Sequence, residues 1–265
     1  MPSASRMPMV SLPVVLALVL TGGLLWVRQA AKEPIDQIAA IVTVTERPPL
    51  PNDVGSAPVA AGPRPVVGSG GYTFMTENGR GPAAYDPCRP LHVVMNPSSA
   101  PAGAEALLDA AIEQIGPAAG LQIVVDGLTD EPAAESRPPT DRARYGNRWS
   151  PVLVAWTDRN QSPGLESAVG IGGSTATADS TGRLWNVSGI VHLDSAEVQG
   201  ILTRREGQKQ AVAVIAHELG HVIGLGHAGV DGQLMSDNGL GSLTLSDGDR
   251  RGLAALANVP CNRQF

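Results

Sequence analysis

One string of eleven residues restricts the fold of this chain more than any other feature. Residues 217–227 read His-Glu-Leu-Gly-His-Val-Ile-Gly-Leu-Gly-His. On a helix, His217 and His221 are four positions apart, so both imidazoles project from the same face and can bind one ion. Glu218 is rotated by about 100° from His217, so its carboxylate can lie beside that ion without being a ligand. The string therefore predicts a helix that carries a metal site.

A third ligand requires this helix to end soon after His221. Gly224 has no Cβ, so it can adopt the left-handed backbone conformation that ends a helix and turns the chain. His227 follows three residues later and can return to the ion. Three neutral histidine ligands leave the fourth tetrahedral position of zinc to water, which is typical of a catalytic zinc site. We expect one catalytic Zn²⁺, bound by His217, His221 and His227.

The string resembles the signature His-Glu-x-x-His-x-x-Gly-x-x-His of the metzincin metalloproteases. The sequence Leu-Met-Ser at 234–236 is similar to the Met-turn of this clan, and its methionine, Met235, lies eight residues after His227. Residues 245–256 resemble the final helix of matrixin catalytic domains. The resemblance covers residues 72–265, closely over 217–235 and loosely elsewhere. It identifies the chain as matrixin-like, of a bacterial type that is anchored in a membrane or secreted.

The resemblance implies a zinc-dependent endopeptidase. In that activity, a metal-activated water attacks a peptide carbonyl, with Glu218 as the general base. The substrate would be a protein or peptide that lies extended in the cleft and pairs with an edge strand, for which residues 170–176 are the candidate. Residues 236–243 would form the wall of the pocket for the side chain that follows the scissile bond.

Some family features are absent from the sequence. Ala228 follows the third histidine where vertebrate matrixins usually have serine, and no tyrosine follows Met235. The sequence around His192 is similar to a structural-metal segment of matrixins. However, no histidine lies between 159 and 180 to complete a second zinc site. We interpret His192 as an ordinary strand histidine, and a Ca²⁺ role for Asp194 is open without a pattern that supports it.

The remaining periodicity predicts an α/β domain with one mixed sheet. Apolar runs favour strands at 91–95, 121–125, 151–156, 170–178 and 187–193. Apolar residues at intervals of three and four favour helices at 101–115 and 208–223, and Ser246 can cap a third helix over 247–257. Combined with the resemblance, this pattern predicts a metzincin-like catalytic domain with a mixed, mostly parallel five-stranded sheet and three helices.

The amino end predicts a membrane segment followed by a spacer. Residues 7–27 carry no charge and are long enough to span a bilayer, so residues 1–28 are expected to be a transmembrane anchor or a signal segment. Residues 29–71 are rich in Pro and Gly and predict an extended linker, with a latency propeptide as the alternative. Residues 72–265 would then be the catalytic domain. We expect it at the extracellular face of the cell membrane, or secreted.

The chain has two cysteines, Cys88 and Cys261. Two thiols in an exported chain usually form a disulfide, which here would join the two ends of the domain. Two unpaired buried thiols are one alternative. The other is that Cys88 is an inhibitory zinc ligand, although its flanking sequence Asp-Pro-Cys-Arg-Pro does not match the motif that matrix metalloproteases use.

The charge pattern and the motif together limit the function classes. The chain has a net charge of −6 and no run rich in Lys and Arg, so we expect no nucleic-acid partner. A non-catalytic surface module that keeps zinc for stability or binding is the main rival to a peptidase. A zinc hydrolase of non-peptide bonds is a second rival. Glu218 argues against the first, because a purely structural site does not need that carboxylate.

Overall fold

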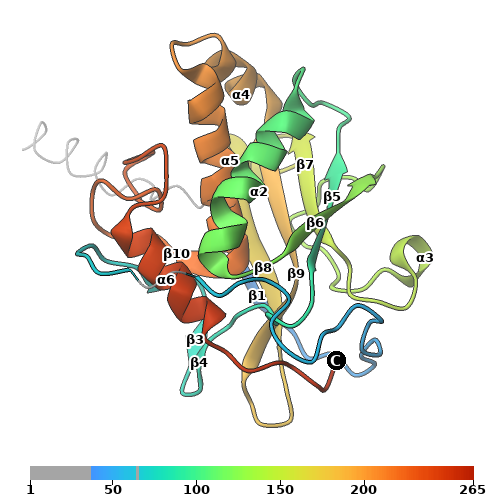
Figure 1. Cartoon of the computed structure of the whole chain (residues 1–265). Coiled ribbons are helices and arrows are strands. Elements are labelled where there is room, and N and C mark those ends of the chain that lie inside the picture. Colours follow the sequence, from blue (N-terminus) through green and yellow to red (C-terminus); the bar gives the residue numbers. More distant parts are fainter. Residues whose placement is uncertain (1–36, 64–65) are drawn as a thin grey trace, which may run out of the picture. The chain divides into compact units, whose positions relative to one another are not determined.

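The structure is a computed structural model of the chain, and it describes residues 37–63 and 66–265 (Figure 1). The membrane segment predicted at 1–28 lies outside the described residues. Among the residues that are described, no helix has both the length and the apolar character needed to cross a membrane.

A mixed sheet of six strands forms the centre of the fold. Neighbouring strands are parallel, except that β8 and β9 are antiparallel. In spatial order the strands are β1 (Gln37–Ile41), β8 (Gly170–Ala178), β9 (Leu184–Asp194), β7 (Val152–Thr157), β5 (Leu91–Asn96) and β6 (Ile123–Leu128). The expected mixed, mostly parallel sheet is therefore confirmed.

The expected number of five strands is wrong, because β1 adds a sixth. This strand comes from the stretch for which the sequence predicts a linker, and it pairs with β8 from Gln37 opposite Gly172 to Ile41 opposite Ala176. Its five residues, Gln-Ile-Ala-Ala-Ile, are too few to show a clear period of two. Consequently β8, which the sequence suggests is an exposed edge strand, has a neighbour on both sides.

The described residues contain five α-helices, where the sequence predicts three. The three expected ones are present as α2 (Ala104–Ala119), α5 (Gly207–Ile223) and α6 (Asp247–Ala257). The additional ones are short: α3 (Arg142–Tyr145) and α4 (Ser195–Leu202). Each begins after an aspartate whose side chain accepts hydrogen bonds from the first turn, Asp141 for α3 and Asp194 for α4.

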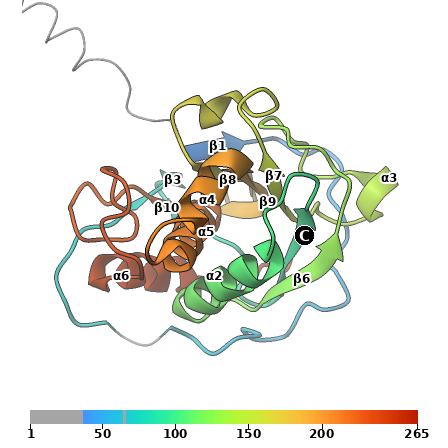
Figure 2. The same cartoon turned by 90° about the horizontal axis from the view of Figure 1, so that it is seen from above.

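The main core lies between one face of the sheet and the helices. Figures 1 and 2 show α2 and α5 side by side on this face. Their buried apolar residues join those of the inner strands in one cluster, which includes Leu108, Ile115, Val154, Leu193 and Leu219. On the other face, Val94, Leu153 and Ala155 pack against Ala133 and Tyr145, which lie in the stretch between β6 and β7. Short ribbons and a 3₁₀ turn complete the fold: β2 (Thr73–Phe74), β10 (Leu225–Gly226), β3 (Glu77–Asn78), β4 (Gly81–Pro82) and η1 (Pro163–Glu166).

Two further sequence predictions can be compared with the structure. Cys88 and Cys261 form a disulfide, with 5.4 Å between their Cα atoms. The prediction of a bridge is confirmed, and the alternative of Cys88 as an inhibitory zinc ligand is wrong because its sulfur is bonded to Cys261.

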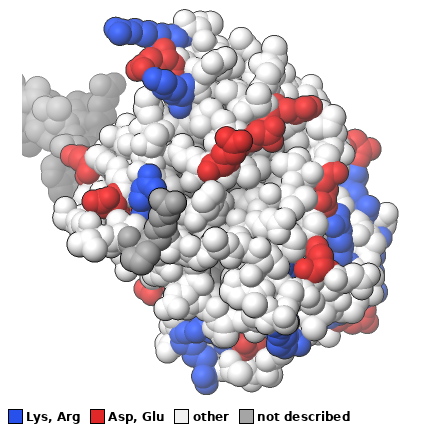
Figure 3. All heavy atoms as spheres, viewed as in Figure 1, with Lys and Arg blue, Asp and Glu red and all other residues white. Residues whose placement is uncertain are grey.

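The surface charge can also be compared with the sequence, which has no run rich in Lys and Arg. On the face shown in Figure 3, acidic and basic side chains are interspersed, and the longest continuous group of like charges is acidic.

Candidate metal centre

Helix α5 carries the first two histidines into the interior. Thirteen of its residues are buried, and its buried apolar residues belong to the main core. His217 is 6% exposed and His221 is fully buried. One helical turn separates them, as their spacing predicts, and their Nε2 atoms are 3.0 Å apart.

Hydrogen bonds fix the orientation and the tautomer of both rings. His217 Nδ1 lies 2.7 Å from the carbonyl oxygen of Leu234, and His221 Nδ1 lies 2.7 Å from that of Leu225. A carbonyl oxygen only accepts hydrogen bonds, so each Nδ1 carries the proton and donates it. Each Nε2 is then left with a lone pair. This is the arrangement in which a neutral imidazole binds a metal ion.

The third histidine reaches the cluster through a sharp turn after α5. Gly224 has a φ of 128°, which only glycine adopts readily, so the prediction that it ends the helix is confirmed. The next two residues form β10, which pairs antiparallel with β2. Thr73 of β2 donates a hydrogen bond of 2.7 Å to the carbonyl of His227. The ring centroid of His227 lies 5.4 Å from that of His217 and 4.9 Å from that of His221.

The segment around Met235, for which the sequence predicts a Met-turn, lies against α5. A Cβ at Gly220 would lie 2.5 Å from the sulfur of Met235, so the methionine packs directly beside the histidine-bearing stretch. A hydrogen bond closes the loop between His227 and Met235, since the N–H of Ala228 donates to the carbonyl of Met235 at 2.6 Å. Asp249, at the start of α6, accepts hydrogen bonds from the N–H groups of Leu234 at 2.9 Å and Met235 at 3.2 Å.

Glu218 lies on the side of α5 that faces β8. Its side chain is buried, with the residue 3% exposed. A Cβ at Gly170 would lie 2.8 Å from Glu218 Cγ, and a Cβ at Gly172 would overlap the Glu218 backbone. The glycines of β8 therefore allow this strand to approach the helix closely at the position of the carboxylate.

The histidine cluster fits a zinc ion. One ligand atom from each histidine lies within 4.8 Å of the others. Two tetrahedral ligands of zinc are about 3.3 Å apart, close to the 3.0 Å between the two Nε2 atoms. Two lone pairs that face each other at this distance repel, and a cation between them removes that repulsion. His217, His221 and His227 could therefore hold Zn²⁺.

Other residues singled out in the sequence lie apart from this cluster. His192 in β9 is fully buried, and its Nδ1 lies 3.0 Å from Ser162 Oγ. In the described part of the chain, the only other group with metal-ligand geometry is Asp86 with the disulfide sulfurs.

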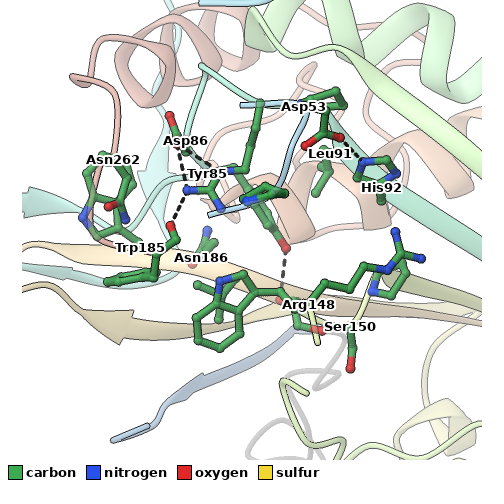
Figure 4. A pocket seen from close by; sticks show the side chains of 18 of the residues that line it. Asp53, Tyr85, Asp86, Leu91, His92, Arg148, Ser150, Trp185, Asn186 and Asn262 are labelled. Atoms are coloured by element: carbon green, nitrogen blue, oxygen red, sulfur yellow. Dashed lines mark hydrogen bonds and ion pairs between the residues drawn. The ribbon is translucent and has the colours of Figure 1, made fainter. Parts of the chain in front are cut away.

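A separate cavity of about 320 Å³ lies between the residues after β1, the start of β5 and the carboxyl end (Figure 4). Its lining includes Tyr85, Trp149 and Phe265, and none of the three clustered histidines.

A family model described as Matrixin matches residues 150–257. This range holds the sheet from β7 to β9, helix α5 with its histidines, and α6. The chain contains a matrixin-like metzincin domain. Its match to this family suggests zinc-dependent peptidase activity.

Individual proteins give no further support for the matrixin-like domain. No curated protein matches the chain. A solved structure titled "GM1 bound form of the ECX AB5 holotoxin" is similar over 63% of this chain and 79% of that chain. The identity is 12% and the TM-score is 0.34, a similarity too low to support a conclusion about fold or function.

Several residues of the matrixin-like site do not follow from the histidine motif alone. The carbonyls of Leu225 and Leu234 orient the imidazoles, and backbone groups leave no signal in a sequence. Asp249 lies in the first turn of α6, where the helix dipole favours an acidic side chain, and it also accepts the N–H groups of Leu234 and Met235. The Gly-Ile-Gly-Gly run at the start of β8 is the one signal that could have shown the close approach of this strand to α5.

Proposed function

We propose that this chain is a zinc-dependent endopeptidase in which Glu218 acts as the general base. The observation that carries the proposal is the pair of Nε2 lone pairs that face each other at 3.0 Å, with both Nδ1 atoms fixed on carbonyl oxygens. A cation bound between the two Nε2 atoms would remove the repulsion between these lone pairs. The match to the matrixin family supports the same activity.

Each residue would have a distinct role. His217, His221 and His227 would hold the ion, which when bound would supply a Lewis acid and lower the pKa of a water molecule. Glu218 is buried one residue after the first ligand, so it can accept a proton from that water and return it to the leaving amine. Met235 would support the ligands from below through its contact with Gly220.

The substrate is proposed to be an extended protein or peptide segment. Gly170 of β8 adjoins the Glu218 carboxylate and lies outside the stretch of β8 that pairs with β1, so a peptide that pairs with β8 there would pass beside the carboxylate. The disulfide favours an oxidising compartment, which supports our proposal that the domain acts outside the cell. Anchorage by residues 1–28 and the linker role of 29–71 remain predictions.

The experiment that tests the function compares the full-length chain with a Glu218→Gln variant. We expect about one zinc per chain in both forms by metal analysis. We expect the variant to cleave a peptide library at least 10²-fold more slowly, because general-base catalysis contributes about 10²–10⁴-fold. Equal cleavage by both forms, or no zinc in the wild type, would overturn the proposal. Zinc in both forms without any cleavage would favour the rival, a non-catalytic zinc-stabilised binding module.

A further inference from the structure

Strand β6 forms an edge of the sheet, at the opposite end of the strand order from β1. In the described part of the chain, β5 is the only strand that pairs with β6. The carbonyl of Gln122 accepts a hydrogen bond of 2.8 Å from β5, and the N–H of Thr129 donates one of 2.9 Å to β5. Main-chain groups alternate in direction along a strand, so those of Val125 and Leu128 point away from β5. These groups can pair with another extended chain.

Apolar side chains are exposed along the β6 edge. Val125 is 39% exposed and Leu128 is 60% exposed, whereas every residue of the inner strand β7 is buried. A sheet edge with exposed apolar side chains is suited to the addition of a further strand. A hollow of about 160 Å³ lies between these two residues and α2, and Met95 and Leu108 belong to its apolar lining. The edge therefore combines main-chain groups with an adjacent space for one long side chain.

Acidic side chains of α2 border the hollow. Glu105 and Asp109 line it, and Glu113 continues the row one turn further along the helix. All three are exposed, and none of them forms an ion pair with another described residue. In Figure 3 the longest continuous group of acidic side chains crosses the region that α2 occupies in Figure 1. Like charges four residues apart on a helix repel each other, so this row favours the approach of a positive charge.

Other acidic groups near β6 are already paired with basic ones. The Asp126 carboxylate lies 2.6 Å from His92 Nδ1 and 3.0 Å from the guanidinium of Arg148. Asp130, just after the strand, pairs with Arg144. The negative charge that is open to a partner therefore lies on the α2 side of the edge. A second copy of the chain would bring the same acidic row and a net charge of −6, so it lacks the complementary charge.

We propose that the β6 edge and the hollow beside it bind an extended segment of a partner protein that carries Arg or Lys. The segment adds a strand to the sheet through its main chain. A basic side chain of the segment places its aliphatic stem on Met95 and Leu108 and its charged head near Glu105 and Asp109. None of the three clustered histidines lines this hollow, and binding there does not depend on the proposed peptidase function.

The test uses the full-length chain with Glu218→Gln, so that the probe is not cleaved if the chain is a peptidase. The probe is acetyl-Thr-Val-Arg-Val-Thr-amide, and its matched partner has Gln in place of Arg. Titration calorimetry measures the affinity of each. We expect the Arg peptide to bind about fivefold more tightly, the effect of one exposed ion pair at the upper end of its range. Salt at about 1 M should remove this preference, because it screens exposed charges.

Two pairs of substitutions test the role of the acidic row. Glu105→Gln combined with Asp109→Asn should abolish the preference for the Arg peptide. Glu77→Gln combined with Glu113→Gln is the matched control, because it changes the net charge equally and neither residue lines the hollow. This control should keep the preference. Equal binding of the two peptides by the parent chain, or loss of the preference in the control as well, would contradict the proposal.

Substitutions at Val125 test the pairing with the main chain. Val125→Pro removes a donor that points away from β5, so the fold should tolerate it, while both peptides should bind about fivefold more weakly. Val125→Thr keeps the N–H and should bind both peptides as the parent does. Hydrogen exchange gives a readout without these substitutions, since the bound peptide should protect the amides of Val125 and Leu128. A bound peptide without this protection, or a dimer of the chain that Val125→Pro separates, would overturn the proposal.

Discussion

At the scale of single residues, the candidate site depends on carbonyl oxygens and a carboxylate that lie outside the histidine cluster itself. Asp249 is the clearest example. Its buried carboxylate accepts hydrogen bonds from the N–H groups of Leu234, Met235 and Ser246. The carbonyl of Leu234 in turn receives the Nδ1 proton of His217. The position of one candidate metal ligand, His217, therefore depends on a residue 32 positions later in the chain.

We predict that Asp249→Asn weakens both stability and zinc binding. The amide nitrogen would face N–H donors that the carboxylate now satisfies, and the loss of such bonds costs roughly 2–4 kcal/mol. Urea unfolding and competition with a zinc chelator measure the two effects. Asp247→Asn is the control, because Asp247 lies in the same first turn of α6 but is exposed. Equal zinc affinity in both variants would contradict the positioning role.

His192 makes a prediction about pH. Burial lowers its pKa to about 4, and the nearby carboxylate of Glu135 only partly offsets this effect. In the unfolded chain its pKa is about 6.5, so the unfolded state takes up a proton first as the pH falls. The contribution of this residue to stability is therefore complete above pH 6.5 and is lost as the pH falls from 6.5 toward 4.

The matching measurement is the free energy of unfolding of wild type and His192→Gln at pH 7 and pH 4.5. A chelator in every sample removes any contribution from metal loss. The wild type should lose roughly 2 kcal/mol more than the variant between these two pH values. Parallel pH profiles would show that His192 is not held neutral by its surroundings.

At the scale of elements, the end of α5 decides whether the third histidine can reach the other two. Gly224 has a φ of 128°, and a Cβ there would lie 3.0 Å from the carbonyl oxygen of Ala83. Gly224→Ala should therefore destabilise the fold by about 1–3 kcal/mol and weaken zinc binding. Thermal unfolding with and without zinc measures both. Gly200→Ala, at an open position within α4, should instead be neutral or slightly stabilising.

The elements also show which parts of the fold a sequence can predict. Strands β5, β7 and β9 and helices α2, α5 and α6 have strong apolar periods, and all were expected near their observed positions. The short elements were missed, because α3, α4 and β1 have too few residues for a period to appear. The glycines of β8 suggested an exposed edge, but they instead permit close contact with Glu218 on one side and Ile38 on the other.

The candidate metal site was predictable for a related reason. Its three histidines lie within one helix and the turn after it, so local spacing determines most of their geometry. The supporting residues come from distant segments, such as Thr73 against His227 and Asp249 against the Met-turn. Contacts of that kind arise from tertiary packing, and the spacing of residues in one segment does not encode them.

At the scale of the whole molecule, one covalent link joins the two ends of the domain. Cys88 precedes β5 and Cys261 follows α6, so the disulfide closes a loop across 173 positions. Non-covalent contacts continue the same junction: Arg89 pairs with Asp86 at 2.9 Å and donates to the carbonyl oxygen of Phe265. The carboxyl end is thereby held against the residues that lead into the sheet.

Removal of this link should lower stability without altering the chemistry of the site. In the chain-entropy model a loop of this length contributes roughly 5 kcal/mol, so the double variant Cys88→Ser/Cys261→Ser should unfold at a markedly lower urea concentration. Reduction of the wild type should produce the same shift, which controls for the serines themselves. Because α5 and the Met-turn are held by their own hydrogen bonds, the folded variant should still bind one zinc per chain. Loss of zinc under conditions where the variant is folded would show that the junction at the carboxyl end also shapes the metal centre.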